Sequence, residues 1–265
     1  MKLGIVTDEI SLNVEEALGY CKEWGIGKVE IRCLQSGRVP YISEEELNKF
    51  IELKNKYGIK VTALSPGFFK GTISEKEKYQ EELDKHLPKL IEMSKVLESN
   101  MIIVFSFNRE AGDENKRGEV INVFREIAER VEKYGLKIAV ENEPGFWCGT
   151  GTKTAEIVKE VGKKNFGVNW DPANAFVKDE EVAFPAGYAS VKPYIFNVHV
   201  KDTKLGSLVK CCPVGEGLID WEGQMKALLQ DKIVEHVTIE THCLPLIEKS
   251  KVDIERINEI IKKYS

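Results

Sequence analysis

The sequence alternates eight times between a short apolar run and a longer amphipathic segment. The apolar runs have the length and the β-branched content of buried strands, and the amphipathic segments have helical periodicity. The predicted strands are Leu3–Thr7, Lys28–Cys33, Lys60–Leu64, Met101–Phe105, Lys137–Glu141, Phe166–Asp171, Ile195–Val200 and Val237–Glu240. The predicted helices are Val14–Trp24, Glu44–Tyr57, Glu75–Leu97, Gly118–Tyr134, Thr154–Val161, Val182–Val191, Trp221–Gln230 and Val252–Tyr264.

This alternation predicts an α/β protein, a (β/α)8 TIM barrel. Every connection between strands is long enough for a crossover helix, so the strands are expected to be parallel and to close into a barrel. An open doubly wound sheet would use fewer strands and usually a glycine-rich first turn, whereas the first strand here leads into Thr7-Asp8-Glu9. No linker or low-complexity segment interrupts the series, and we expect a single domain over residues 1–265.

Several predicted helices carry signals at their ends. Ser43-Glu-Glu-Glu46 and Ser74-Glu-Lys-Glu77 have the form of a capping box, in which a Ser and a Glu three residues later satisfy each other's backbone N–H groups. Gly25, Gly58 and Gly135 follow three helices at the position where a left-handed residue is preferred. These signals support the predicted boundaries.

Composition limits the class of protein. The net charge is −5, which argues against a broad nucleic-acid surface. No apolar run approaches the roughly 20 residues that a membrane span needs, and the chain opens in a strand and not in a signal peptide. We therefore expect a cytoplasmic protein without nucleic-acid or membrane partners. The six cysteines include no CxxC pair, and we expect them to be reduced.

Four predicted strands end in a carboxylate or an imidazole. Glu141, Asp171, His199 and Glu240 terminate the fifth to eighth strands and are separated by 30, 28 and 41 residues, about one β/α unit each. In a barrel these strand ends meet at one mouth. Burying such groups without partners costs several kcal/mol, so a shared metal ion would explain all four.

Three carboxylates and one imidazole suit one divalent cation. Mn²⁺ is our preferred ion, with Mg²⁺, Co²⁺ or Zn²⁺ as alternatives. Such an ion would polarise a carbonyl of a bound sugar or polyol and stabilise the enediolate formed by proton removal next to it. Glu141 and Glu240, on opposite sides of the rim, are placed to take and return that proton.

Five motifs resemble the xylose isomerase-like TIM barrel superfamily of sugar isomerases and epimerases, over the whole chain. They are Ala139-Val-Glu-Asn-Glu-Pro144, Val168-Asn-Trp-Asp-Pro-Ala-Asn174, Asn197-Val-His-Val-Lys-Asp202, Val214-Gly-Glu-Gly-Leu-Ile-Asp-Trp221 and Ile239-Glu-Thr-His242. The resemblance implies a metal-dependent carbohydrate isomerase or epimerase, and a homo-oligomer. It matches Glu141, Asp171, His199 and Glu240 to the family's metal ligands, and the two glutamates to the acid/base pair of its ketose 3-epimerases.

The chain departs from those epimerases at two positions. They carry a His three residues after the strand-6 aspartate, where this chain has Asn174, and an Arg six residues after the strand-7 histidine, where it has Leu205. We therefore expect other groups near the strand ends to hold the substrate. These candidates are Glu143, Lys201, Asn174 and His242, with Lys204 and Glu30 as further possibilities.

The remaining residues near the mouth have simpler interpretations. Glu30 and Arg32 share a face of the second strand and are expected to pair with each other. Arg109 is a loop arginine that could meet a phosphate, but one arginine without a glycine-rich cradle favours an unphosphorylated substrate. His86 and His236 are expected on the surface. The loop aromatics, which pack their loops or exclude water from the sugar, are Phe68, Phe69, Phe146 and Trp147.

Three alternatives remain open from sequence. The same site could serve an inosose or dehydroshikimate dehydratase, since that reaction also begins with proton removal next to a carbonyl. An endonuclease IV-like nuclease would need three metals and many histidines at the mouth, and this chain has four histidines in all. A non-catalytic sugar-binding barrel is disfavoured because unused buried carboxylates would destabilise the core.

Overall fold

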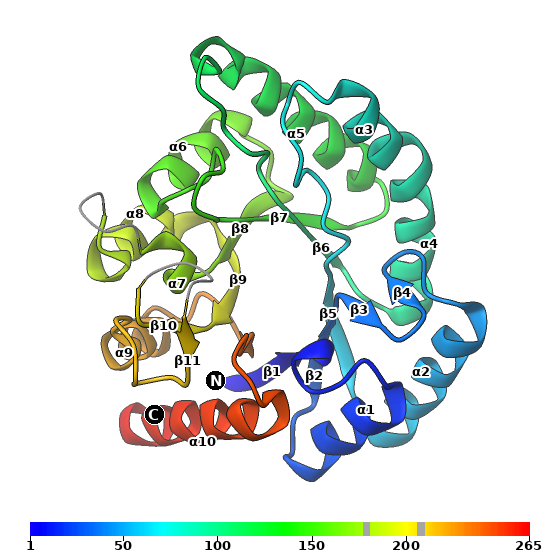
Figure 1. Ribbon diagram of the computed structural model, residues 1–265, viewed down its shortest axis with the longest axis vertical. Helices are drawn as coiled ribbons and strands as arrows, with labels where there is room; N and C mark the ends of the chain where they lie inside the picture. Colours follow the sequence, from blue (N-terminus) through cyan, green and yellow to red (C-terminus); the bar gives the residue numbers. More distant parts are fainter. Residues whose placement is uncertain (177–180, 206–209) are drawn as a thin grey trace.

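Eight parallel strands form a closed barrel in the computed structural model, which describes residues 1–176, 181–205 and 210–265 (Figure 1). Each strand pairs with its sequence neighbours, and the first strand pairs with the last, in the order β1-β12-β9-β8-β7-β6-β5-β2. The single-domain TIM barrel predicted from sequence is thus confirmed. The barrel strands are β1 (Lys2–Val6), β2 (Lys28–Ile31), β5 (Lys60–Leu64), β6 (Met101–Val104), β7 (Lys137–Glu141), β8 (Phe166–Trp170), β9 (Ile195–Val200) and β12 (His236–Ile239).

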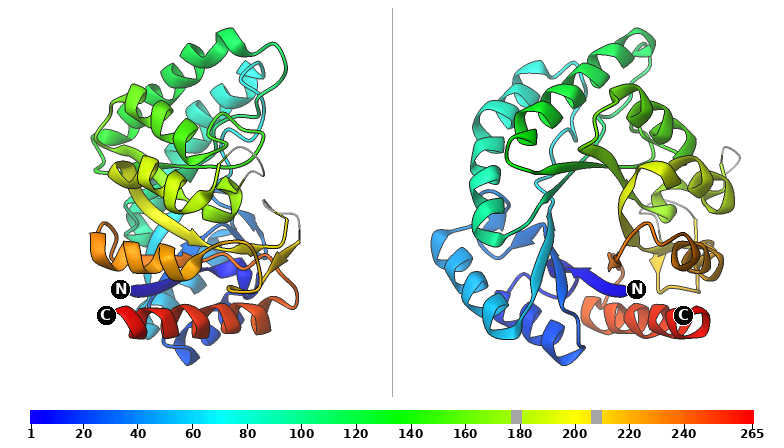
Figure 2. Two further views of the ribbon diagram at one scale, coloured as in Figure 1. Left: turned by 90° about the vertical axis from the view of Figure 1, so that its left-hand side faces the viewer. Right: turned by 180° about the vertical axis from the view of Figure 1, so that it is seen from behind.

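Helices surround the barrel as an outer ring (Figure 1), and the side view in Figure 2 shows them running alongside the strands. Strands such as β6 and β8 are buried along their whole length because helices cover one face and the barrel interior the other. The α-helices of the ring are α1 (Val14–Glu23), α2 (Glu44–Tyr57), α3 (Lys76–Glu81), α4 (Leu87–Leu97), α5 (Arg117–Glu132), α6 (Gly151–Val161), α8 (Tyr188–Val191), α9 (Trp221–Asp231) and α10 (Leu246–Tyr264).

One predicted helix is interrupted. The segment predicted as Glu75–Leu97 forms α3, a π-helical turn η2 (Glu82–His86) and α4. Pro88 lies in the first turn of α4 and has no N–H to donate to the carbonyl of Asp84, so the regular hydrogen-bond ladder cannot run through this point. The Val182–Val191 prediction is likewise replaced by a π-helical turn, η4 (Ala183–Gly187), followed by α8.

Two short hairpins beyond the barrel were not predicted. One joins β3 (Cys33–Leu34) to β4 (Gly37–Arg38), and the other joins β10 (Asp202–Thr203) to β11 (Cys211–Cys212). Both lie in loops at the C-terminal ends of barrel strands. Residues 206–209 of the second loop lie outside the described residues.

The predicted helix-end signals are partly correct. Gly25, Gly58 and Gly135 have φ values of 71°, 68° and 72°, as the left-handed position requires. Ser43 caps α2 by accepting from the N–H of Glu46 at 3.2 Å. The second capping box is wrong, because α3 begins at Lys76 without a side-chain cap.

The last strand and the last helix start earlier than predicted. β12 begins at His236, which is paired with Lys2, the first residue of β1, and α10 begins at Leu246. The two chain ends lie side by side in Figures 1 and 2, where α10 packs along the barrel beside α9. All six cysteines are free thiols, as expected. No helix among the described residues is long and apolar enough to cross a membrane.

Candidate metal centre and active site

The four predicted ligands lie together at the mouth of the barrel. Glu141 is the last residue of β7, His199 lies in β9, and the two other side chains, Asp171 and Glu240, directly follow β8 and β12. All four are buried, and one potential ligand atom from each lies within 4.8 Å of the others. Because the C-terminal ends of all barrel strands open to the same side, residues far apart in the sequence converge here.

Glu30 fixes the orientation of the His199 imidazole. Nε2 of His199 lies 2.8 Å from Oε2 of Glu30, which is 1% exposed. Nδ1 of His199 faces the other way, at 3.3 Å from Oε2 of Glu240 and 3.7 Å from Oε2 of Glu141. A carboxylate on one ring nitrogen leaves the other free to bind a metal, which is the usual environment of a metal-ligating histidine.

Side-chain amides hold the tips of β7 and β8. Nδ2 of Asn169 donates to Oε2 of Glu141 at 3.1 Å, and Nδ2 of Asn174 donates to Oε1 at 3.2 Å. Asn142 exchanges two hydrogen bonds with the backbone of Asp171, at 2.8 and 2.9 Å. The two amide hydrogen bonds to Glu141 therefore come from neutral donors, and its position relative to Asp171 is fixed.

Glu240, in contrast, is surrounded by cations. The buried ammonium of Lys201 lies 3.0 Å from its Oε2 and 2.7 Å from Oδ2 of Asp171, and Arg32 donates to its Oε1 at 2.7 Å. Burial would raise the pKa of Glu240, but Lys201, His242 and His199 hold that pKa well below its usual value. Glu240 is thus a weaker base than an ordinary buried carboxylate.

The predicted pairing of Glu30 with Arg32 is wrong. Arg32 instead reaches Asp8 at 2.8 Å and Glu9 at 2.6 Å, in addition to Glu240. Two residues on one face of a strand point to different levels of the barrel, and here Glu30 lies beside His199 while Arg32 lies at the rim. Arg32 therefore links the first strand end to the last one.

Sequence reasoning missed Glu9. This residue follows β1, is 1% exposed, and accepts hydrogen bonds from the backbone N–H of His242 at 2.8 Å and from its ring at 2.5 Å. Together with Glu240 these residues form a second group of possible ligand atoms. The signal was available, because Glu9 lies three residues after the end of β1 and so at the same end of the barrel as Glu240.

A cavity of about 200 Å³ opens beside the four buried side chains. All four residues predicted to bind the substrate line it: Glu143, Lys201, Asn174 and His242. Burial, with the neighbouring charge of Glu141, raises the pKa of Glu143 to about 7. Glu143 is therefore able to exchange a proton at neutral pH.

Two cations in this cavity were not singled out from sequence. Arg38, in the β3–β4 hairpin, donates from Nε to the carbonyl of Ser65 at 3.1 Å and lies against Gly67, where a Cβ would come within 2.9 Å of its Cζ. Lys70 holds its ammonium 4.0 Å from the ring centroid of Phe105. Among the residues that the structure describes, neither cation has a carboxylate within 4.0 Å.

The other loop candidates lie outside the cavity. Arg109 packs over the ring of Trp147 at 5.1 Å and borders a different hollow. Phe68 and Phe69 are buried, with Phe69 stacked on Phe107 at 4.8 Å, so they pack their loop. The apolar wall of the cavity is provided by Phe105, which contacts Phe146 at 5.9 Å.

The donor set fits a divalent cation. Ligand atoms that lie about 2.1 Å from one ion are separated from one another by about 3–4.2 Å, which agrees with the 4.8 Å limit observed. Oδ2 of Asp171 is buried and accepts no hydrogen bond of good geometry. Two cations compete with an ion for these donors: the Lys201 ammonium contacts Asp171 and Glu240, and the Arg32 guanidinium contacts Glu240.

Residues 18–260 match the family described as xylose isomerase-like TIM barrel. The chain belongs to this family, and the match confirms the resemblance found in the sequence motifs.

Individual relatives are distant. The chain is 24% identical over 267 residues to an inosose isomerase of Bacillus licheniformis, covering 95% of this chain and 94% of that protein. It is 25% identical over 231 residues to an uncharacterized protein of Methanocaldococcus jannaschii, covering 84% of this chain and 76% of that protein. A crystal structure of the IolI protein with a bound zinc atom superposes with a TM-score of 0.81 at 22% identity, covering 100% and 99% of the two chains, and this likeness shows the shared fold.

Proposed function

We propose that this chain is a divalent-metal-dependent isomerase or epimerase of a small polyhydroxylated carbonyl compound, such as a sugar or an inosose. The observation that carries the proposal is the convergence of Glu141, Asp171, His199 and Glu240, with Glu30 aligning the imidazole. The distant inosose isomerase relative supports the same reaction class. The structure of the IolI protein, which holds zinc, supports the presence of an ion.

The four convergent side chains would hold the ion, with Mn²⁺ as the preferred metal and Zn²⁺ as the nearest alternative. When bound, the ion supplies Lewis-acid polarisation of a substrate carbonyl, which makes a neighbouring C–H acidic. Lys201 would then give up part of its contact with Asp171 and Glu240 and donate to a substrate oxygen in the cavity that it lines.

Glu141 is the proposed base that removes the proton from carbon. Its carboxylate is contacted by the amides of Asn169 and Asn174, whereas that of Glu240 is contacted by Arg32 and Lys201. Amide donors stabilise a carboxylate less than cations do, and this difference in contacts is why Glu141, and not Glu240, is assigned the role of the base. Glu240 would face the opposite side of the reacting carbon, as epimerisation requires.

Glu143 is the proposed proton donor to a substrate oxygen. It lines the cavity, is about half-buried and has a pKa of about 7, so a substantial fraction is protonated at neutral pH. In an isomerisation the oxygens of two neighbouring carbons exchange protonation states, and a group that titrates near neutrality is suited to this exchange.

The charge of the cavity favours a substrate that carries an acidic group. Arg38 and Lys70 add two positive charges to the lining of the cavity. Neither has a carboxylate within 4.0 Å among the described residues. A substrate carboxylate or phosphate would supply the missing counter-charge. Such a substrate retains the hydroxy-carbonyl part that the carboxylates of the centre would act on.

The test is proton exchange in heavy water. The full-length protein is stripped with a chelator, reloaded with Mn²⁺ or Zn²⁺, and incubated with inososes, ketoses and their carboxylated or phosphorylated analogues, while NMR follows the C–H signal next to the carbonyl. Metal-dependent loss of that signal, abolished in Glu141→Gln, is expected. Metal binding without exchange on any of these compounds would overturn the proposal. Water loss to an enone, visible by ultraviolet absorption, would identify the dehydratase alternative.

A nuclease is less consistent with the site. Of the four histidines, only His199 and His242 lie at the mouth in the structure. The cavity of about 200 Å³ is smaller than a flipped nucleotide and its sugar-phosphate neighbours require.

A further inference from the structure

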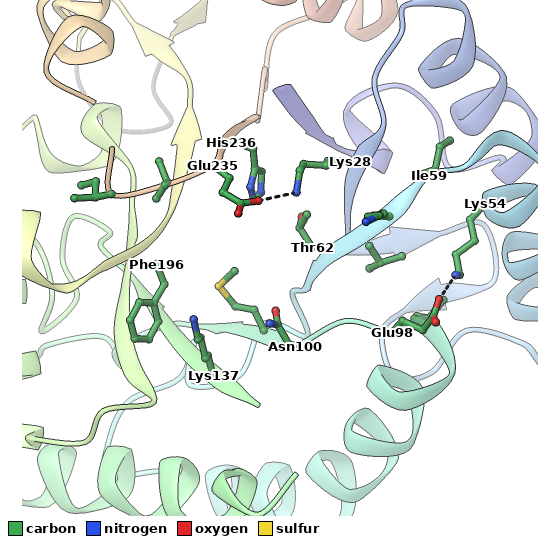
Figure 3. Close-up of a pocket in the computed structure, with 16 residues that line it drawn as sticks. Lys28, Lys54, Ile59, Thr62, Glu98, Asn100, Lys137, Phe196, Glu235 and His236 are labelled. Carbon is green, nitrogen blue, oxygen red and sulfur yellow. Dashed lines mark hydrogen bonds and ion pairs between the residues drawn. The ribbon is translucent and has the colours of Figure 1, made fainter. Parts of the chain in front are cut away.

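A second cavity lies at the opposite end of the barrel, where the strands begin (Figure 3). Its volume is about 600 Å³, and none of its lining residues borders the cavity at the mouth. Buried apolar side chains at mid-strand, among them Ala63, Ile103 and Ala139, form a cluster between the two ends. This cavity at the N-terminal ends of the strands, the lower cavity, is therefore separate from the proposed active site.

Three strand-starting lysines face this cavity. Lys28, Lys60 and Lys137 are the first residues of β2, β5 and β7, and all three line the hollow. Lys28 and Lys60 are register partners on neighbouring parallel strands, so their charges lie side by side. Like charges in such positions repel one another unless an anion lies between them.

Few carboxylates compensate these charges. Glu235 is 4.0 Å from the ammonium of Lys28, but its own side chain is 89% exposed. Lys54 is paired with Glu98 at 3.0 Å, and Figure 3 shows this pair at the edge of the cavity. In the described part of the chain, no carboxylate lies within 4.0 Å of the Lys60 or Lys137 ammonium.

A buried histidine faces the same space. His236 was expected on the surface but is 8% exposed, because it is the first residue of β12 and lines the cavity. Its Nε2 is buried and has no hydrogen-bond partner among the described residues. Figure 3 shows the ring beside the end of the Lys28 side chain, with Lys137 across the hollow. The His236 ring thus borders the lysine-lined cavity, although Nε2 itself is closed off from it.

We propose that this lower cavity binds a phosphate group, either free or carried by a small organic molecule. The ammonium groups of Lys28, Lys60 and Lys137 would neutralise it, and the ring of His236, which borders the same cavity, would lie close enough to sense its charge. Three lysines opposed by one exposed glutamate favour an anion with two charges over one with a single charge. The volume leaves room for a sugar or similar group attached to the phosphate.

The experiment follows the histidine ring signals of the full-length protein by NMR during titration with inorganic phosphate, against sodium chloride at the same ionic strength. The chain has four histidines, and His236→Gln assigns the relevant signal. A saturable shift of the His236 signal with phosphate alone is expected. The double variant Lys60→Gln/Lys137→Gln should weaken binding about 100-fold, about tenfold for each charged hydrogen bond. The control Lys251→Gln/Lys262→Gln changes the net charge equally on the exposed face of α10 and should leave affinity unchanged.

Three outcomes would overturn the proposal: equal phosphate affinity in the native chain and the Lys60/Lys137 variant, the same shift with chloride, or a shift of His199 or His242 without His236. A parallel titration with glycerol 3-phosphate distinguishes the sources of the group. Tighter binding of the ester identifies a phosphorylated small molecule as the ligand, and equal binding identifies free phosphate.

Discussion

Glu30 and His199 are 169 positions apart in the sequence, yet the carboxylate of one lies 2.8 Å from Nε2 of the other inside the barrel. The contact joins β2 to β9 and turns Nδ1 of the imidazole toward Glu141 and Glu240. Asn197 donates to the second oxygen of Glu30 at 2.6 Å, so the carboxylate is itself fixed. The orientation of His199, a candidate metal ligand, is therefore determined by Glu30 and Asn197, which lie deeper in the barrel.

Replacing Glu30 by Gln should weaken metal binding about 10–100-fold, because the ring loses the partner that sets its tautomer and orientation. Titration calorimetry with Mn²⁺ and Zn²⁺ measures the change. Glu235→Gln removes a carboxylate that is 89% exposed and is expected to bind metal like the native chain. Unchanged affinity in Glu30→Gln would show that His199 does not depend on this contact.

Replacing Lys201 by Gln should make stability strongly dependent on metal. Without the ammonium, Asp171 and Glu240 lose the counter-charge at 2.7 and 3.0 Å, and breaking a buried pair costs about 3–5 kcal/mol in free energy of unfolding. A bound divalent ion restores the charge balance. Calorimetric melting should therefore show a larger rise in Tm on adding Mn²⁺ for the variant than for the native chain.

Lys192→Gln is the matched control for that measurement, because Lys192 pairs with Asp231 at 2.6 Å on the surface, far from the mouth. Its loss should cost at most about 1 kcal/mol, and the effect of metal on Tm should equal that in the native chain. Equal metal effects in Lys201→Gln and the native chain would contradict binding at Asp171 and Glu240.

Replacing Arg38 by Leu should discriminate between substrates. If Arg38 holds an acidic group, KM for a carboxylated or phosphorylated substrate should rise about tenfold while KM for a neutral analogue stays the same. Gly67→Ala should act in the same direction, since the added Cβ would lie 2.9 Å from Cζ of Arg38. Arg109→Leu is the control, because Arg109 packs over Trp147 outside the cavity. An equal change in KM for the acidic and the neutral substrate would indicate that Arg38 has a structural role only.

The convergence of Glu141, Asp171, His199 and Glu240 could be predicted because it depends only on topology. Eight alternating units specify a closed barrel, and a closed barrel places every strand end at one mouth. The predicted strand boundaries needed to be correct only to within one or two residues for this conclusion. The same logic, applied to Asp8 and Glu9 after the first strand, would have included Glu9.

The cation contacts could not be predicted, because they depend on where long side chains reach. Lys201 is two residues beyond His199, and the sequence does not show whether its ammonium turns to solvent or to Asp171. The burial of His236 depends on a shift of one residue at the start of β12, which its pairing with Lys2 determines. Side chains alternate between the two faces along a strand, so register decides which of them point inward.

Asp253 provides a test of how the fold responds to pH. It lies on α10, is 0% exposed, and accepts a hydrogen bond from the N–H of Val214 at 2.7 Å, while its Oδ2 has no hydrogen-bond partner among the described residues. Burial raises its pKa to about 7 from a usual value of 3.8. The folded state thus holds this proton more tightly than the unfolded state, so stability should fall as pH rises from about 4 to 7.

Asp253→Asn keeps the acceptor for Val214 and removes the ionisation, so the variant should be more stable than the native chain above pH 7, by at most about 4 kcal/mol. The advantage should disappear below pH 4, where the native carboxyl is protonated in both states. Urea unfolding across this range measures the difference, with the exposed Glu132→Gln as a control that should follow the native profile. A constant difference between Asp253→Asn and the native chain at every pH would show that Asp253 does not titrate in this window and that the variant acts through packing alone.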